Sequence, residues 1–307
     1  MLHQHLDNGA VFRYVCCMIT RCILVVFSAV LLLLSGPAGA ENKHLPQARY
    51  TVAIIPFYSP EKIWLLYAPL IDYLKKTTKQ PWELKLYPNH DSLIEDLCSG
   101  QIAVALLGPV PLGRANRKCG AEPLIVALGR DGKPTYRSVI VTSDATVTAL
   151  GGVRGKKFGF FKGSTAAHIV PAKLLKDAGL GGEAVQPVFF ESQDRIMTAL
   201  LTGEISAAGV KETLYRKFER EPLRVLTISG PLPNFAFSAL PSLSSRLRDA
   251  FAQALLQLKP HANTRDADMM KGWDDEIRNG FMLPAQDFLP SVLNVLGTYR
   301  EIMHEDQ

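Results

Sequence analysis

The sequence predicts an α/β protein built as two lobes. Strand-like apolar runs alternate with helix-length segments along most of the 307 residues, which is the pattern of βαβ units and a mostly parallel sheet. The stretch 93–108 (LIEDLCSGQIAVALLG) is echoed by the stretch 196–211 (IMTALLTGEISAAGVK), each a helix, a glycine stop and a short apolar strand. The length also suggests two domains, and a hydrophobic content of 47% excludes a mainly disordered chain.

Composition and motifs exclude several functional classes. The net charge of +5 is small and dispersed, whereas nucleic-acid binders carry a basic stripe, so we expect no nucleic-acid partner. The five cysteines form no paired CxxC pattern, and no histidines have metal-ligand spacing, so we expect no metal. The sequence has no G-x-S-x-G, H-E-x-x-H, Walker or G-x-G-x-x-G motif. We therefore expect neither an enzyme nor a cofactor.

Residues 1–40 predict a secretory signal peptide. Arg21 precedes the apolar run Ile23–Leu34, and small residues follow it up to Ala38-Gly39-Ala40, which predicts cleavage after Ala40. The run is shorter than the roughly 20 residues of a spanning helix, so a retained membrane anchor is the less favoured alternative. The region before the run is long, and the sequence leaves open whether Met1 or Met18 is the true start.

Two cysteines follow the predicted cleavage point. Cys98 and Cys119 remain once residues 1–40, which hold the other three cysteines, are removed. Because an exported protein reaches an oxidising compartment, an even pair favours a disulfide. Two buried free thiols are the alternative.

The first half of the mature chain alternates strands and helices in order. Each expected strand is an apolar or alternating run, and each expected helix has apolar residues at helical spacing or a glycine at its end. The strands expected are 50–56, 82–87, 102–107, 124–130 and 136–142. The helices expected between them are 63–77, 90–99 and 110–118.

The pattern then restarts in the second half. The strands expected are 157–161, 184–190, 205–210 and 223–229, and the helices are one opening at Gly163 and one at 192–202, which Gly203 ends. The final segment is expected to be largely helical, most clearly at 242–258 and 285–304.

The segment Phe160–Ala167 is the first candidate for chemistry. An apolar strand runs into Gly163, Ser164 and Thr165, and a helix follows. A helix start offers free N–H groups and the positive end of a dipole, which together suit an anion, and the small Ala166 lets an anion approach the backbone. An ordinary helix cap without a ligand is the alternative, and Pro171 should make the helix restart or kink.

The chain resembles the periplasmic substrate-binding proteins for phosphonate, phosphite and phosphate-like solutes. The matching segments run in order over nearly all of the mature chain: VAIIPFYSPEKIWLLYAPLIDYL, LCSGQIAVALLGPVPLGRANRKCGAEPL, RDGKPTYRSVIV, VRGKKFGFFKGSTAAHIVPAKLL, FFESQDRIMTALLTGEISAAGV and LRVLTISGPLPN. The resemblance implies the type II periplasmic binding-protein fold, with a ligand cleft between two lobes. It also implies a periplasmic location and supports the disulfide between Cys98 and Cys119.

The resemblance also implies ligand-binding residues. In the family a strand–STSG–helix unit binds the anion, and here Ser164 and Thr165 keep the first two hydroxyls while Ala166 and Ala167 replace the other two residues. The family's Y-x-S strand corresponds to Tyr136 and Ser138.

Two departures from the family pattern concern the ligand. Gln193-Asp194 stands where the family often has His-Asp, which replaces a chargeable group with a neutral amide. The aromatic residue that often follows the Gly-Pro turn is absent after Gly108-Pro109.

Five further polar residues have competing interpretations. Asp194 either contacts ligand or stabilises a helix N-terminus, and Tyr58 and Ser59 either line the site at the end of the first strand or form a turn. Lys211 could present a charge to an anion, but a solvated lysine is favoured. His168 is expected to be a partly exposed helix residue.

We therefore expect a monomeric periplasmic protein with three parts. Residues 1–40 are the signal peptide, 46–132 with 232–307 form lobe 1, and 133–231 form lobe 2. The lobes should close around a small anionic solute. The resemblance implies delivery to an inner-membrane ABC permease. The alternative is a periplasmic sensor that reports occupancy to a membrane histidine kinase.

Overall fold

The first lobe, which we call lobe 1, is built on a six-stranded sheet. The computed structural model describes residues 49–303, so the predicted signal peptide, its cleavage point and the choice of start lie outside the described residues. The strand order is β13-β4-β12-β3-β1-β2. The strands are β1 (Tyr50–Ile54), β2 (Trp82–Leu86), β3 (Val104–Leu107), β4 (Glu122–Ala127), β12 (Ala236–Ala239) and β13 (Phe281–Met282).

Helices cover this sheet and bury apolar faces against it. They are α2 (Pro60–Thr78), α3 (His90–Cys98), α4 (Pro109–Cys119), α8 (Ser245–Leu256), α9 (Thr264–Met270) and α10 (Phe288–Met303). Helix α2 begins where the Ser59 side chain accepts a hydrogen bond from the Lys62 N–H and ends at Lys79, which takes a positive φ of 57°. Its buried residues, Tyr67 among them, recur at helical spacing and join the main core.

The second lobe, lobe 2, is built on a five-stranded sheet in the order β10-β6-β9-β7-β8. The strands are β6 (Ser138–Thr142), β7 (Lys157–Phe161), β8 (Gln186–Phe190), β9 (Ala207–Lys211) and β10 (Arg224–Ile228). The helices are α5 (Val170–Asp177), α6 (Gln193–Leu201) and α7 (Glu212–Lys217), with the short turns η1 (Leu150–Val153), η2 (Thr165–Ile169) and η3 (Gly182–Ala184).

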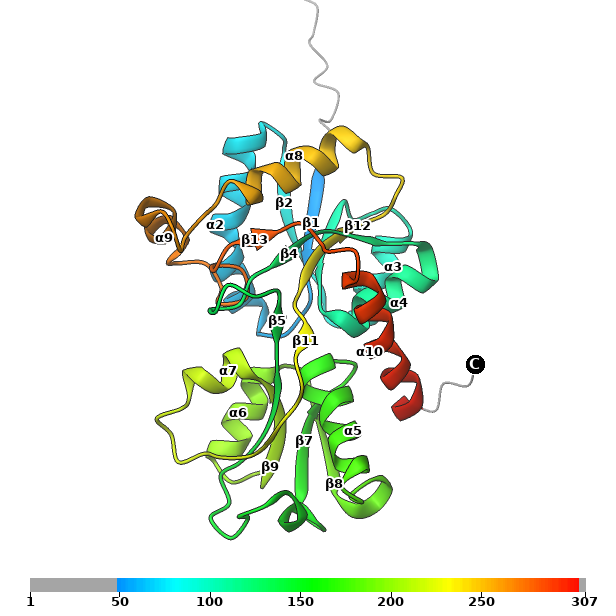
Figure 1. Ribbon diagram of the computed structural model, residues 1–307, viewed down its shortest axis with the longest axis vertical. Helices are drawn as coiled ribbons and strands as arrows, with labels where there is room; N and C mark the ends of the chain where they lie inside the picture. The colour runs from blue at the N-terminus through cyan, green and yellow to red at the C-terminus, as the bar shows by residue number, and fades with distance from the viewer. Residues whose placement is uncertain (1–48, 304–307) are drawn as a thin grey trace, which may run out of the picture. The chain divides into compact units, whose positions relative to one another are not determined.

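Two short strands carry the chain between the lobes. Strands β5 (Thr135–Tyr136) and β11 (Leu232–Pro233) pair antiparallel with each other and run between the two sheets (Figure 1). The described residues belong to one compact unit, Ala48–Gln307. Helix α10 packs on α4 and also contacts η2 and α5 of lobe 2, so it adds a third link between the lobes.

The expectation of a mostly parallel sheet is wrong for the described sheets. Strand β1 pairs in parallel with β2 and β3, and β7 pairs in parallel with β8 and β9. The other pairings are antiparallel, because β12 returns to lobe 1 from the lobe 2 side and inserts between β3 and β4. In lobe 2, β6 likewise follows the interlobe strand β5 and lies antiparallel to β9.

The expected strands and helices of the mature chain are all present, with shifted bounds except for β7, which has the expected bounds 157–161. The expected strand 136–142 is divided at Arg137 into β5 and β6. Strands β11, β12 and β13 and helices α7 and α9 were not anticipated. The expected restart near Pro171 is confirmed, because η2 is a π-helical turn and α5 begins at Val170. Within residues 49–303, no helix combines the length and apolarity that crossing a membrane requires.

A disulfide joins Cys98 at the end of α3 to Cys119 at the end of α4, as the sequence predicted. The bond closes a loop with a sequence separation of 21 residues. Replacing both cysteines with serine should lower the free energy of unfolding by about 3 kcal/mol, because the unfolded chain loses its cross-link. Urea titration of the variant against the oxidised protein measures this difference. An unchanged midpoint and slope would contradict it.

Candidate functional site

The carboxyl ends of strands from both lobes converge on one small cavity, which we call the inner pocket. It lies between the lobes, where the ligands of open α/β sheets lie. Residues after β1, β3 and β7 line it, together with Lys211 at the end of β9 and Tyr136 of the interlobe strand β5. Its lining residues are Ile55, Phe57, His90, Gly108, Pro111, Tyr136, Phe161, Ser164, Thr165, Ala166, Gln193, Lys211 and Phe235.

The start of η2 provides polar groups to the inner pocket. Ser164, Thr165 and Ala166 are buried and all line it. The Ser164 hydroxyl caps the turn by accepting a hydrogen bond from the Ala167 N–H (3.2 Å). The Thr165 hydroxyl accepts a hydrogen bond from the Val110 N–H of lobe 1 (3.0 Å). The amides at the very start of a helix have no intrahelical acceptor, so this turn can donate to an anion.

Tyr136 and Ser138 have different positions relative to this pocket. Tyr136 lines it, and its buried hydroxyl makes no hydrogen bond of good geometry, although it lies near Thr165. Burial raises the pKa of Tyr136, so the phenol is neutral and can donate. Ser138 is fully buried outside the lining and donates to the Ala166 carbonyl (2.6 Å), which holds the turn in place.

Gln193 and Asp194 are the first two residues of α6, and their side chains have different surroundings. Gln193 lines the inner pocket, and its side-chain oxygen accepts a hydrogen bond from the Lys211 N–H (3.2 Å). Asp194 lies away from the lining and forms an ion pair with Lys62 of lobe 1 (3.0 Å). The structure therefore brings Gln193 to the pocket and uses Asp194 to tie the lobes together.

Tyr58 and Ser59 also lie outside the lining. Tyr58 is buried, accepts a hydrogen bond from the Lys217 ammonium (3.1 Å) and stacks under the Lys62 ammonium (4.0 Å from its ring centre). Burial, with nearby carboxylates, raises the pKa of Tyr58. Ser59 is exposed and caps α2.

Lys211 is buried, so the expectation of a solvated lysine is wrong. Only 2% of the residue is exposed, and it lines the inner pocket. Its ammonium lies 4.0 Å from the ring centre of Tyr136 and 3.6 Å from that of Phe235. It donates to the Asn234 side-chain oxygen (3.2 Å) and forms an ion pair with Glu276. Burial lowers the pKa of Lys211, and the Glu276 carboxylate opposes this shift.

Two buried carboxylates beside Lys211 were not foreseen. Glu276 and Asp274 are 4% and 1% exposed and belong to the polar segment 271–280. Asp274 accepts hydrogen bonds from the Tyr67 hydroxyl (3.3 Å) and the Glu276 N–H (3.0 Å). Burial, followed by the Glu276 charge, raises the pKa of Asp274 to about 6. The segment KGWDDEIRNG has the composition of an exposed loop, so nothing local signals its burial.

Two histidines near the pocket are neutral at pH 7. His90 lines the pocket, and burial, followed by the Arg114 charge, lowers its pKa to about 4. His168 was expected to be partly exposed but is buried, and burial together with Lys162 lowers its pKa to about 4. Its Nδ1 atom accepts a hydrogen bond from the Gly163 N–H (3.1 Å), which the protonated ring could not do.

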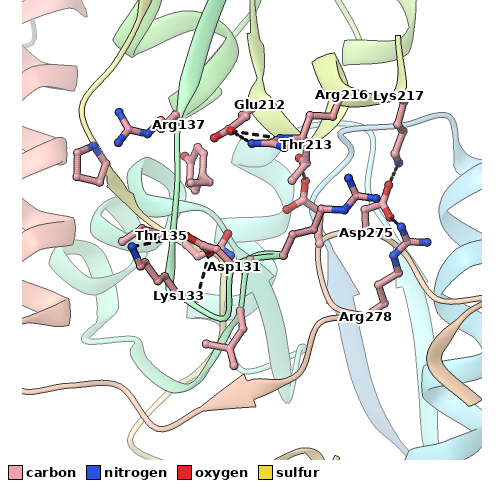
Figure 2. A pocket seen from close by; sticks show the side chains of 17 residues that line it. Asp131, Lys133, Thr135, Arg137, Glu212, Thr213, Arg216, Lys217, Asp275 and Arg278 are labelled. Carbon is pink, nitrogen blue, oxygen red and sulfur yellow. Dashed lines mark hydrogen bonds and ion pairs between the residues drawn. The ribbon is translucent and has the colours of Figure 1, made fainter. Parts of the chain in front are cut away.

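The inner pocket is nearly filled, while a much larger cavity lies beside it. The inner pocket has a volume of about 10 Å³, which is room for one water at most. The second space, which we call the outer cavity, measures about 820 Å³ and is lined mainly by residues 128–137, α7 and segment 275–278 (Figure 2). Tyr136 lines both spaces. Any solute larger than a water could enter the inner pocket only if the lobes moved apart.

Charged groups of both signs line the outer cavity. Asp275 pairs with Lys217 across the lobes (2.9 Å) and with Arg278, and Arg216 pairs with Glu212 (Figure 2). Among the described residues, no group of three histidine, cysteine, aspartate or glutamate side chains is placed to hold a metal ion.

Known proteins resemble this chain in sequence and in structure. The family model for the periplasmic substrate-binding protein of phosphonate ABC transporters matches residues 52–282. A binding-protein component of an ABC phosphonate transporter from Pseudomonas aeruginosa superposes with a TM-score of 0.72 at 16% identity, covering 85% of this chain and 89% of that one.

Two further structures share the fold. A protein from Prochlorococcus marinus in complex with methylphosphonate has a TM-score of 0.68 at 14% identity, covering 83% of this chain and 99% of that one. The aliphatic sulphonate-binding protein of Escherichia coli has a TM-score of 0.58 at 16% identity, covering 84% of this chain and 92% of that one. At these identities, the likeness shows the two-lobe fold.

Proposed function

Because the chain belongs to the family of periplasmic substrate-binding proteins of phosphonate ABC transporters, we propose that it binds a small oxyanion between its lobes and delivers it to an inner-membrane permease. The observation that carries this proposal is the buried start of η2, which places two hydroxyls and helix-end amides in the wall of the inner pocket. No observation favours the alternative of a sensor for a histidine kinase.

The proposed ligand-binding residues are those that line the inner pocket. Ser164, Thr165 and Ala166 would donate to the anion, and Tyr136 and Gln193 would add neutral polar groups. The Thr165 hydroxyl oxygen accepts a hydrogen bond from the Val110 N–H of lobe 1, and the hydrogen of the same hydroxyl can donate to an anion. Ser138 supports the turn from behind.

The double variant Ser164→Ala, Thr165→Val tests this assignment. It should weaken binding of the oxyanion identified by screening by about 100-fold, because two hydrogen bonds to a charged ligand are lost at about 1.5 kcal/mol or more each. Isothermal titration calorimetry measures the affinity.

The matched control is Asn263→Ala, which removes the exposed N-cap of α9 in lobe 1. This control should lose about 1 kcal/mol of stability and keep its affinity. An unchanged affinity in the double variant would exclude the η2 turn as the binding element.

The expectations about export, oligomeric state and turnover belong to the same proposal. The family is periplasmic, and we propose that the exported protein begins at Glu41 after cleavage of residues 1–40. We also propose that it acts as a monomer without turning over its ligand. Intact-mass measurement of the exported protein tests the first of these, and a mass that includes residues 1–40 would contradict it.

A further inference from the structure

We propose that Lys211 is the cationic partner of the bound anion and that Glu276 occupies the anion's place on Lys211 when no ligand is present. This inference rests on the proposed function, because it concerns the same inner pocket. It assigns roles to two residues and restricts the ligand to anions that can displace a carboxylate from a buried ammonium.

Lys211 is placed to face a ligand in the inner pocket. It ends β9 in lobe 2, lines the pocket beside Thr165 and Ala166, and holds its ammonium against the rings of Tyr136 and Phe235. An anion in contact with the start of η2 would therefore lie in the same small space as this ammonium. The contacts among residues 49–303 give Lys211 one charged partner, Glu276, and one neutral acceptor, Asn234.

Glu276 holds its place through contacts with the opposite lobe. It lies between α9 and β13 in lobe 1, whereas both of its side-chain partners belong to lobe 2. One carboxylate oxygen pairs with the Lys211 ammonium, and the other accepts a hydrogen bond from the Thr213 hydroxyl (2.7 Å). Glu276 also lines the outer cavity, so it stands between the two spaces. The contacts of Glu276 with Lys211 and with Thr213 must both break when the lobes separate.

Charge balance then makes the carboxylate and the ligand competitors. A buried ammonium needs a paired anion, and a second anion beside Glu276 would bring two buried negative charges together. When the lobes open, the Lys211 ammonium loses Glu276 and can pair with the ligand instead. Glu276 then faces the outer cavity, whose lining includes the basic residues Lys217 and Arg278. Neutral and cationic solutes cannot take the place of Glu276, so they should leave the closed, unliganded arrangement intact.

The variants Glu276→Gln and Lys211→Met test this inference. With phosphate and methylphosphonate as probes in calorimetric titrations, Glu276→Gln should bind at least about tenfold more tightly than the wild type, since a neutral amide competes poorly with an anion. Lys211→Met should bind at least about tenfold more weakly, because the ligand loses its counter-charge. The control is Lys176→Met, which removes an exposed interlobe ion pair with Glu301; neither residue lines the inner pocket, so the affinity should change by less than about twofold.

A third variant keeps the inference testable if Glu276→Gln folds poorly. Thr213→Val removes one of the two contacts of the carboxylate and should tighten binding by about threefold. Equal affinities of the wild type and the variants of Glu276 and Thr213 would overturn this inference while the proposed function stands. If Glu276→Gln bound the probes and the wild type did not, the result would support both this inference and the proposed function. Absence of binding in the wild type and in Glu276→Gln would overturn both.

Discussion

Replacing Gly209 with alanine should lower the free energy of unfolding by at least about 3 kcal/mol. A Cβ atom at Gly209 would lie 2.0 Å from Cγ and 2.5 Å from Cβ of Pro171, far inside van der Waals contact. The proline ring is rigid, so the clash cannot be relieved by a rotamer change and must displace α5 from β9. Because α5 continues from η2, the same displacement should also weaken anion binding.

Chemical denaturation followed by circular dichroism measures this effect. The matched control is Gly297→Ala, at an exposed position of α10 where an added Cβ would meet open space, which should gain up to about 1 kcal/mol from helix propensity. Adding Pro171→Gly to Gly209→Ala removes the clashing atoms and should recover part of the loss. A Gly209→Ala protein as stable as the wild type would show that β9 and α5 are not packed as described.

Lowering the pH from 7.5 to 5 should destabilise the protein by about 4 kcal/mol through His90 and His168 alone. Each histidine titrates near its ordinary pKa of about 6.5 when unfolded, whereas burial lowers the pKa in the folded protein to about 4. Between these two values the unfolded chain binds more protons than the folded one, so stability rises with pH across this window. Each histidine accounts for about 2 kcal/mol at pH 5.

The test is the difference in unfolding free energy between the wild type and single glutamine variants, followed from pH 7.5 to pH 5. His90→Gln and His168→Gln should each remove about half of this pH dependence, because each removes one depressed pKa. His261→Gln, at an exposed position, is the control and should leave the slope unchanged. If neither buried histidine alters the slope, their rings are open to protonation in the folded state.

Local sequence signals predict the strands that lie in the middle of βαβ units. Strand β7 has the bounds expected from its apolar run, and one of its two partners in the sheet, β8, is also the next strand in the chain. Strand β12 was missed because its four residues become a strand only by inserting between β3 and β4, which are more than a hundred residues away in the chain. The mixed strand directions follow from the same crossover and have no local signature.

The candidate site shows the same division between local and distant signals. Ser164 and Thr165 directly follow a strand and a glycine in the sequence, so their common position in the inner pocket could be anticipated. The pair of Lys211 and Glu276 could not, because 65 residues separate the partners and each resembles an exposed charge. The burial of both side chains is a property of the two lobes together.

Binding of phosphorus oxyanions by ligand-stripped protein tests the central claim most directly. Phosphate, phosphite, methylphosphonate and aminoethylphosphonate, with sulfate and neutral solutes for comparison, are added one at a time in a thermal-shift experiment. We expect at least one phosphorus oxyanion, at about 100 times its dissociation constant, to add about 2.7 kcal/mol to the free energy of unfolding. We also expect the Ser164→Ala, Thr165→Val protein to lose this response. An unshifted midpoint with every anion, or a response that survives in the double variant, would contradict an oxyanion site at the start of η2.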